Sequence, residues 1–142
     1  MPGDIVGVWS PAENIYLDFS EDYVVHNVVI EDIDGKTVGD WTKDAYFYEP
    51  GYNMVVYVGE GQIAEVYQIV EMNDKSLTWC LVDEVDAANE ENLGHMVGDI
   101  INKAQEGYEL NPELYQSFKK VPEEEFMKIL ESLDVFYPWW DE

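Results

Sequence analysis

The chain contains no arginine, only one cysteine and only two histidines. Arginine is the side chain that most often binds phosphate or carboxylate groups, through two parallel hydrogen bonds. We therefore do not expect a phosphoryl-transfer enzyme or a protein that binds organic anions. The single cysteine, Cys80, excludes an internal disulfide. Its position between Trp79 and Leu81 predicts burial as a small apolar side chain.

Patterns for metal binding and for nucleophilic catalysis are missing as well. His26 and His95 lie far apart in the sequence, and neither has a further ligand at helical or strand spacing, whereas zinc and iron need three or four such ligands. The stretch that begins at Asp32 does not continue as a calcium-binding loop. No serine lies in a G-x-S-x-G turn. We expect no metal, no cofactor and no enzymatic activity.

Positive charge is scarce, because 31 acidic residues stand against seven lysines and give a net charge of -24. The acidic residues are spread through both halves of the chain, so we expect a negative surface throughout. Such a surface repels nucleic acids and anionic membranes, and attracts cations or basic proteins. No apolar run reaches the length of a membrane span, and the first residues lack a signal-peptide pattern. The compartment stays open: cytoplasmic, or secreted or periplasmic if a leader has been removed.

The chain does have enough apolar residues, 46%, and enough length for one domain with a substantial core. Before residue 85, short β-rich runs alternate with turn signals such as Asp34-Gly35 and Pro50-Gly51. The segment 15–19 alternates apolar and polar side chains, as a strand with one buried face does. The expected strands are 5–10, 15–19, 23–30, 37–48, 53–58, 62–72 and 76–82.

After residue 88 the apolar period becomes helical. A first helix is predicted to begin at Asn89 and to end at Gly107, a second begins at Asn111-Pro112, and a third begins at Pro122. Gly94 and Gly98 share one face of the first helix, which predicts close approach to another backbone. The sequence therefore predicts a mainly β protein. An antiparallel barrel of seven or eight strands (residues 1–87) is followed by two or three α-helices (residues 88–142) that pack on it, in one compact unit.

Gly7-Val8-Trp9 on the first expected strand is a G-x-W motif, followed by a meander of strands. Over about residues 4–86 the chain resembles the bacterial lipocalin-like proteins, which are small calycin-type β-barrels. The resemblance implies that Trp9 closes one end of the barrel and that Gly7 lets the chain bend there. Lipocalins commonly stack an arginine on this tryptophan. A lysine could replace it here, and the only lysine late in the expected barrel is Lys75, in a predicted turn.

Aromatic side chains recur through the expected strands. Alternation predicts that Phe47 and Trp79 point inward together with Leu17 and Phe19, and these four are the candidate ligand-binding residues of the barrel interior. In a small barrel such side chains either fill the core or line a cavity for an apolar ligand. Filling is the simpler expectation.

The chain ends in VFYPWWDE, which contains four aromatic residues, Phe136, Tyr137, Trp139 and Trp140. Exposed aromatics at a chain end favour aggregation, so we expect these rings to be buried. They can lie along the protein's own helices, plug an open end of the barrel, or act as interface anchors in a neighbouring molecule.

We expect a non-catalytic binding protein that carries a small apolar or aromatic ligand in a lipocalin-like barrel. Two alternatives stay open. The first is an acidic module that binds a basic protein, as an inhibitor or immunity-type partner does. The second is a homodimeric scaffold held by the helices and the aromatic tail. An apolar cavity of a few hundred Å³ favours the carrier, and a solid interior with a concentrated acidic face favours the acidic module.

Overall fold

The computed structural model describes residues 5–59, 63–86 and 93–141, and within them the chain forms eight β-strands and two α-helices. The strands are β1 (Gly7–Ala12), β2 (Ile15–Phe19), β3 (Val24–Ile33), β4 (Lys36–Glu49), β5 (Met54–Val58), β6 (Ile63–Met72), β7 (Ser76–Asp86) and β8 (Tyr115–Val121). The helices are α1 (Leu93–Glu106) and α2 (Glu123–Glu131), and short 3₁₀ turns are η1 (Pro50–Tyr52), η3 (Pro112–Leu114) and η4 (Trp139–Asp141).

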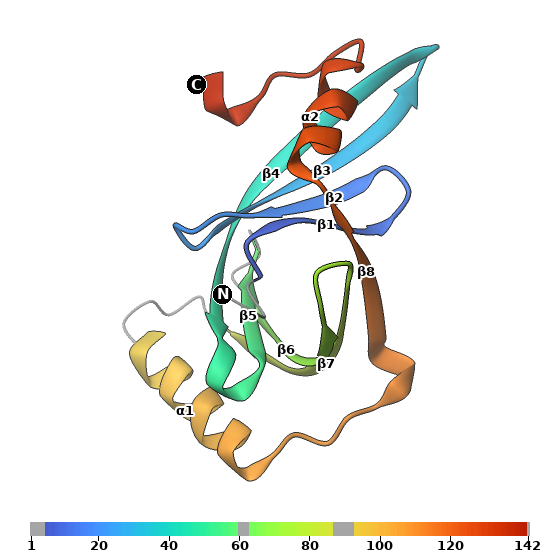
Figure 1. Cartoon of the computed structure of the whole chain (residues 1–142). Helices are drawn as coiled ribbons and strands as arrows, with labels where there is room; N and C mark the ends of the chain where they lie inside the picture. Colours follow the sequence, from blue (N-terminus) through green and yellow to red (C-terminus); the bar gives the residue numbers. More distant parts are fainter. Residues whose placement is uncertain (1–4, 60–62, 87–92, 142) are drawn as a thin grey trace.

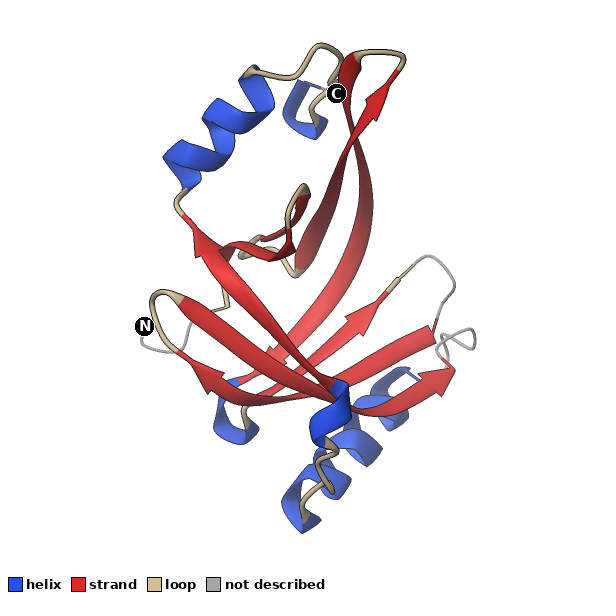
Figure 2. Cartoon of the chain, turned by 90° about the vertical axis from the view of Figure 1, so that its right-hand side faces the viewer, coloured by secondary structure: helices blue, strands red, loops and turns tan. Residues whose placement is uncertain are grey.

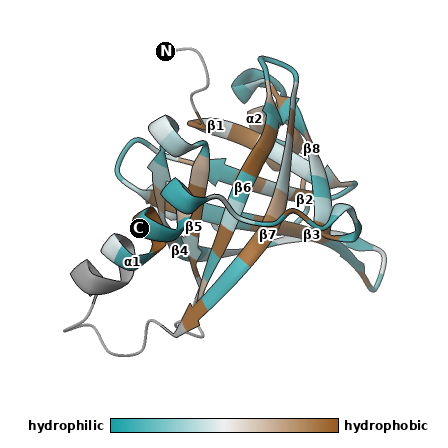
Figure 3. Ribbon diagram, turned by 90° about the horizontal axis from the view of Figure 1, so that it is seen from below, coloured by the Kyte–Doolittle hydropathy of each residue, from teal (hydrophilic) through white to brown (hydrophobic). Residues whose placement is uncertain are grey.

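The eight strands form one closed antiparallel barrel in the order β1 to β8, and β8 completes it by pairing with both β7 and β1 (Figure 1). Hydrophobic and hydrophilic positions alternate along the barrel strands, as expected where one face of a sheet is buried (Figure 3). Asp34 and Gly35 connect β3 to β4 with φ angles of 53° and 80°, the two-residue turn that the sequence predicts. The predicted antiparallel barrel is confirmed.

The strand that closes the barrel is the main correction to the sequence analysis. Asn111-Pro112 does start a helical turn, because the Asn111 side chain accepts a hydrogen bond from the Glu113 N–H at 3.1 Å. That turn ends at Leu114 and the chain continues as β8, so the predicted second helix is wrong. The barrel therefore does not end at residue 87. Under this turn, Cys80 is buried as predicted, with its Sγ 3.4 Å from the Asn111 carbonyl oxygen.

Helix α1 covers the outer face of β5 and β6. Ile100 is buried there against Val56 and Val66. Gly107 ends the helix as predicted, with a φ of 91° and its N–H donating to the Lys103 carbonyl at 3.0 Å. The predicted N-cap Asn89, and the surroundings of Gly94, lie outside the described residues. Gly98 is exposed, and no atom of the described residues lies within 4 Å of its Cβ position, so the predicted close approach to another backbone does not occur within this part of the chain. Contact of this face with a second subunit stays a prediction.

Helix α2 covers another part of the outer wall. Phe126 and Leu130 are buried against Val8, Val28 and Val121, which point outward from β1, β3 and β8. The long β3–β4 hairpin extends beyond the barrel, and α2 and the C-terminal segment lie beside it, on the side opposite α1 (Figures 1 and 2). Neither described helix has the length and apolar character needed to cross a membrane.

Candidate functional site

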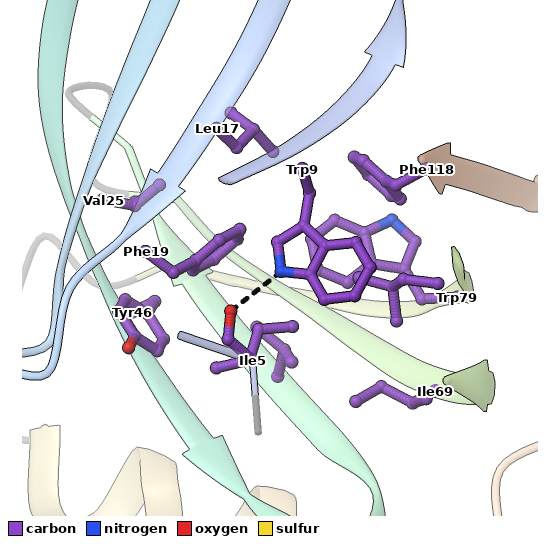
Figure 4. Packing of buried hydrophobic residues seen from close by; sticks show 11 residues of the cluster. Ile5, Trp9, Leu17, Phe19, Val25, Tyr46, Ile69, Trp79 and Phe118 are labelled. Carbon is purple, nitrogen blue, oxygen red and sulfur yellow. Dashed lines mark hydrogen bonds between the residues drawn. The ribbon is translucent and has the colours of Figure 1, made fainter. Parts of the chain in front are cut away.

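One end of the barrel interior is filled with side chains (Figure 4). Trp9 is only 1% exposed, and its indole N–H donates to the Ile5 carbonyl oxygen at 2.9 Å. Phe19 packs edge-on against Tyr46, with 4.9 Å between the ring centroids. The N-terminal segment and side chains from β1, β2 and β4 thus fill this end of the barrel.

A lysine covers the Trp9 ring at this closed end. Lys120 lies opposite Trp9 across the β1–β8 pair, and its Nζ stands 4.4 Å from the ring centroid and donates to the Val6 carbonyl at 3.1 Å. Gly7 has a φ of 130°, and a Cβ on it would overlap the Lys120 ammonium. The cation on Trp9 is thus Lys120 rather than Lys75, and it comes from the strand that the sequence analysis placed in the helical region.

Asp18 lies in a hollow beside this end of the barrel, together with Lys120 and Glu123. Burial raises the pKa of the Asp18 carboxyl from 3.8 to about 6; Glu123 adds to the rise and Lys120 opposes it. Because the folded state binds this proton more tightly than the unfolded state, the ionised carboxylate destabilises the fold. This penalty is absent below about pH 3.8 and is complete above about pH 6.

We expect Asp18→Asn to stabilise the protein at pH 7.5 by ~1–2 kcal/mol. The rise in the pKa of Asp18 corresponds to a free energy of ~3 kcal/mol, and solvent screening of this partly exposed carboxyl reduces that free energy. At pH 5, which is above the isoelectric point of about 4.1, the gain should be clearly smaller. Urea unfolding at both pH values measures the difference, with Asp22→Asn on the surface as the control. An equal gain at both pH values would show that Asp18 does not titrate as described.

The other end of the barrel interior contains a cavity of about 280 Å³. Along the β1–β2 hairpin it lies beside Pro11 and Ile15 at the turn, whereas Gly7 and Phe19 line the hollow at the opposite end. The cavity is lined by Pro11, Ile15, Leu17, Asn27, Asp44, Tyr57, Glu65, Tyr67, Trp79, Gln116 and Phe118. The simple expectation of a filled barrel is therefore wrong for this end.

Three aromatic rings and an amide form one wall of the cavity. Trp79 stacks on Tyr67 with 4.2 Å between centroids and 14° between the ring planes, and the Phe118 ring meets Trp79 at 4.7 Å in an edge-to-face contact. The Trp79 indole N–H donates to the Gln116 Oε1 at 3.1 Å. These contacts define the orientation of Trp79 in a wall made mainly of aromatic rings.

The polar side chains of the cavity lie near the end of the barrel where β5 connects to β6. The Tyr57 hydroxyl donates to the Asp44 Oδ2 at 2.6 Å, and burial together with this hydrogen bond raises the pKa of Tyr57 well above its usual value. Burial, together with the negative charge of the nearby Glu65 carboxylate, also raises the pKa of Tyr67. Both hydroxyls therefore stay protonated. The Asn27 Oδ1 is buried with no hydrogen-bond partner among the described residues.

The predicted interior residues divide into three groups. Leu17 and Trp79 line the cavity, and Phe19 belongs to the filled end. Phe47 does not face the interior: it packs under α1 with the outward-facing residues of β5 and β6, so this prediction is wrong. Tyr46 and Tyr48 on either side of it point inward instead. Helix α1 covers the outer face of the barrel wall at this point. The outward position is therefore apolar, and Phe47, the one ring of the three without a hydroxyl group, occupies it.

Sequence reasoning missed the polar part of the cavity. Asp44 and Glu65 are two among 31 acidic residues, and nothing local distinguishes them. The signal that could have found them is strand alternation: an acid at an inward position of a strand, two residues before an inward tyrosine. Both Asp44–Tyr46 and Glu65–Tyr67 fit this pattern.

The aromatic C-terminal segment lies outside the cavity, on the β3–β4 hairpin and α2. Trp139 stacks on His26 with 4.1 Å between the ring centroids and 5° between their planes. The Trp41 indole N–H donates to the Tyr137 carbonyl at 2.7 Å, and Phe136 packs in the same cluster. The segment is thus held within its own chain and does not plug the barrel.

Part of this segment still faces solvent. The Tyr137 side chain is 80% exposed and Trp140 is 47% exposed. Trp140 and Phe136 also line a groove of about 270 Å³ beside α2. In the described part of the chain, no three His, Cys, Asp or Glu side chains are grouped as a metal site requires, and the His95 side chain lies outside that part.

No model of a known protein family matches this chain, and no match was found among curated proteins or among solved structures. The barrel, its cavity and the side chains that line the cavity are therefore the basis for assigning a function.

Proposed function

We propose that this protein binds, without catalysis, a small molecule with an apolar or aromatic body in the barrel cavity. The observation that carries the proposal is a cavity of about 280 Å³ at one end of a barrel whose other end is filled. This volume lies just below the ~300–1,000 Å³ of typical ligand sites, so the ligand is small. Apolar walls with a few polar groups are the usual composition of such sites.

The closed end supports a carrier of lipocalin type. Gly7, Trp9 and a cation on the tryptophan ring are the features that the lipocalin resemblance implies, and Lys120 supplies that cation. The reactive groups support binding rather than catalysis. Cys80 is buried under the η3 turn, away from the cavity lining, and Tyr57 and Tyr67 keep their hydroxyl protons.

A cavity-blocking substitution tests the proposal. Ile15→Trp places a large ring at a lining position, and we expect it to weaken binding of an environment-sensitive apolar dye at least tenfold, because the dye and the indole compete for the same space. The matched control is Tyr16→Trp, on the neighbouring residue, which packs with the outer cluster under α2. Fluorescence titration measures both, and native mass spectrometry of the purified wild-type protein detects any co-purified ligand.

Unchanged dye binding in Ile15→Trp, with both variants folded by circular dichroism, would contradict binding in the cavity. Loss of binding in Tyr16→Trp alone would move the site to the outer cluster.

A second candidate function is protein interaction through the C-terminal segment. It is favoured by the exposure of Tyr137 and Trp140, since such aromatic side chains are common at the centres of interfaces. A dimeric scaffold or an acidic partner of a basic protein would use this surface. The native mass spectrum also counts subunits, and a monomer at micromolar concentration would argue against the homodimer.

A further inference from the structure

The cavity contains negative charge that no protein cation balances. Its lining includes the carboxylates of Asp44 and Glu65 and, among the described residues, no lysine or histidine. Lys43, next to Asp44 in β4, lines a different hollow, on the outer face. Within residues 5–59, 63–86 and 93–141 the one ion pair joins Lys103 to Asp83, so neither cavity carboxylate forms a salt bridge there.

The charged groups that line the cavity, the carboxylates of Asp44 and Glu65, are hydrogen-bond acceptors. The Tyr57 hydroxyl already donates to Asp44, so its proton is used within the protein, and the Tyr67 hydroxyl lies near the Glu65 carboxylate. The remaining lone pairs of both carboxylates can accept further hydrogen bonds. Such a site favours a ligand that donates hydrogen bonds.

The polar and apolar parts of the cavity are separated along the strands. Glu65 is close to the start of β6, and Tyr57 is close to the end of β5. Trp79 is the fourth residue of β7 and Phe118 is the fourth residue of β8, and their rings contact each other. A ligand that fits both parts has one polar end and one apolar or aromatic end.

We propose that the ligand is a small organic cation, an amine whose ammonium group binds Asp44 and Glu65 while its apolar or aromatic body packs against Trp79, Phe118 and Leu17. This identification rests on the proposed binding function and narrows its chemistry. Charge-assisted N–H···O hydrogen bonds to carboxylates are about twice as strong as neutral ones, and they strengthen inside a protein. An anionic ligand would meet two like charges with no arginine or lysine to offset them.

The negative surface charge of the protein also favours a cationic ligand. A net charge of -24 raises the local concentration of small cations around the protein and speeds their association. This effect is general and falls with ionic strength, whereas binding inside the cavity depends on two particular carboxylates. Measurements at 150 mM and 500 mM salt separate the two contributions.

Three ligands with the same aromatic body and different charge test the proposal: phenethylamine, 2-phenylethanol and 3-phenylpropionate. We expect phenethylamine to bind at least tenfold more tightly than the alcohol, and the carboxylate to bind most weakly, by isothermal titration calorimetry at 500 mM salt. Binding of the alcohol or the acid with an affinity equal to that of the amine would overturn the cation assignment and leave the proposed binding function intact. No binding of any of the three, together with no dye binding, would overturn both.

Two isosteric substitutions test whether the amine binds at Asp44 and Glu65. Asp44→Asn and Glu65→Gln should each lower the affinity for phenethylamine about tenfold and change the affinity for 2-phenylethanol less than twofold. The matched control is Asp40→Asn, which removes one charge from the same strand as Asp44 at an exposed position outside the cavity lining. Equal loss in Asp40→Asn and Asp44→Asn would show that the amine responds to the overall field and not to the cavity.

Discussion

Replacing Phe126 with alanine is expected to destabilise the protein by ~3–5 kcal/mol, the usual cost of removing a fully buried aromatic ring. Phe126 is 1% exposed and lies between α2 and the outer wall of the barrel, where it packs with Val8, Val28 and Val121. Its ring also contacts Tyr16, with 5.5 Å between centroids. The free energy of unfolding in urea, followed by circular dichroism, measures the effect.

The matched control is Lys128→Ala, an exposed position of the same helix, which should change stability by less than ~0.5 kcal/mol. Phe126→Ala should also loosen the C-terminal segment, because α2 leads directly into this segment and Leu133 and Phe136 belong to the same cluster as Phe126. A loss of less than ~1 kcal/mol for Phe126→Ala would mean that α2 does not depend on this ring for its attachment.

Replacing Gly7 with alanine should cost ~2–4 kcal/mol. A φ of 130° is unfavourable for any residue with a Cβ, at ~1–3 kcal/mol, and the new methyl group would displace the Lys120 ammonium from the Trp9 ring and from the Val6 carbonyl. Gly35→Ala is the matched control, because Gly35 also has a positive φ but nothing near its Cβ position. It should cost only ~1–2 kcal/mol.

A double-mutant cycle separates backbone strain from the clash with the lysine. If the clash matters, Gly7→Ala should cost less in a Lys120→Ala background than in the wild type. Equal costs in the two backgrounds would assign the whole effect to the backbone conformation at Gly7.

The local patterns of the sequence were sufficient for most of the sheet. Seven expected strands match β1 to β7, and the segment 15–19 matches β2 (Ile15–Phe19) without any change of boundary. The eighth strand could not be predicted in this way. Its inward positions include Gln116, which holds Trp79, and Lys120, which covers Trp9, so the apolar alternation of an ordinary strand is missing. The Asn111-Pro112 signal before this strand does start a helical turn, but that turn ends at Leu114 and no helix follows it.

The apolar half of the candidate site was partly predictable, and the polar half was not. Leu17 and Trp79 were found because they alternate with polar neighbours on their strands. Phe47 was assigned to the wrong face because Tyr46, Phe47 and Tyr48 are all aromatic, and only the covering helix decides which of them turns outward. Asp44 and Glu65 line the same cavity from β4 and β6, which both pair with β5, so their common position depends on strand pairing and not on any one segment.

The position of β8 in the chain affects how the protein is made. A growing polypeptide can form β1 to β7 as it leaves the ribosome, but β1 gains its second neighbour only when residues 115–121 have emerged. Until then the outer edges of β1 and β7 carry unpaired backbone N–H and C=O groups, which are open to pairing with other chains. Because the chain carries 31 acidic residues, we expect nascent molecules to repel one another, which disfavours pairing at these edges.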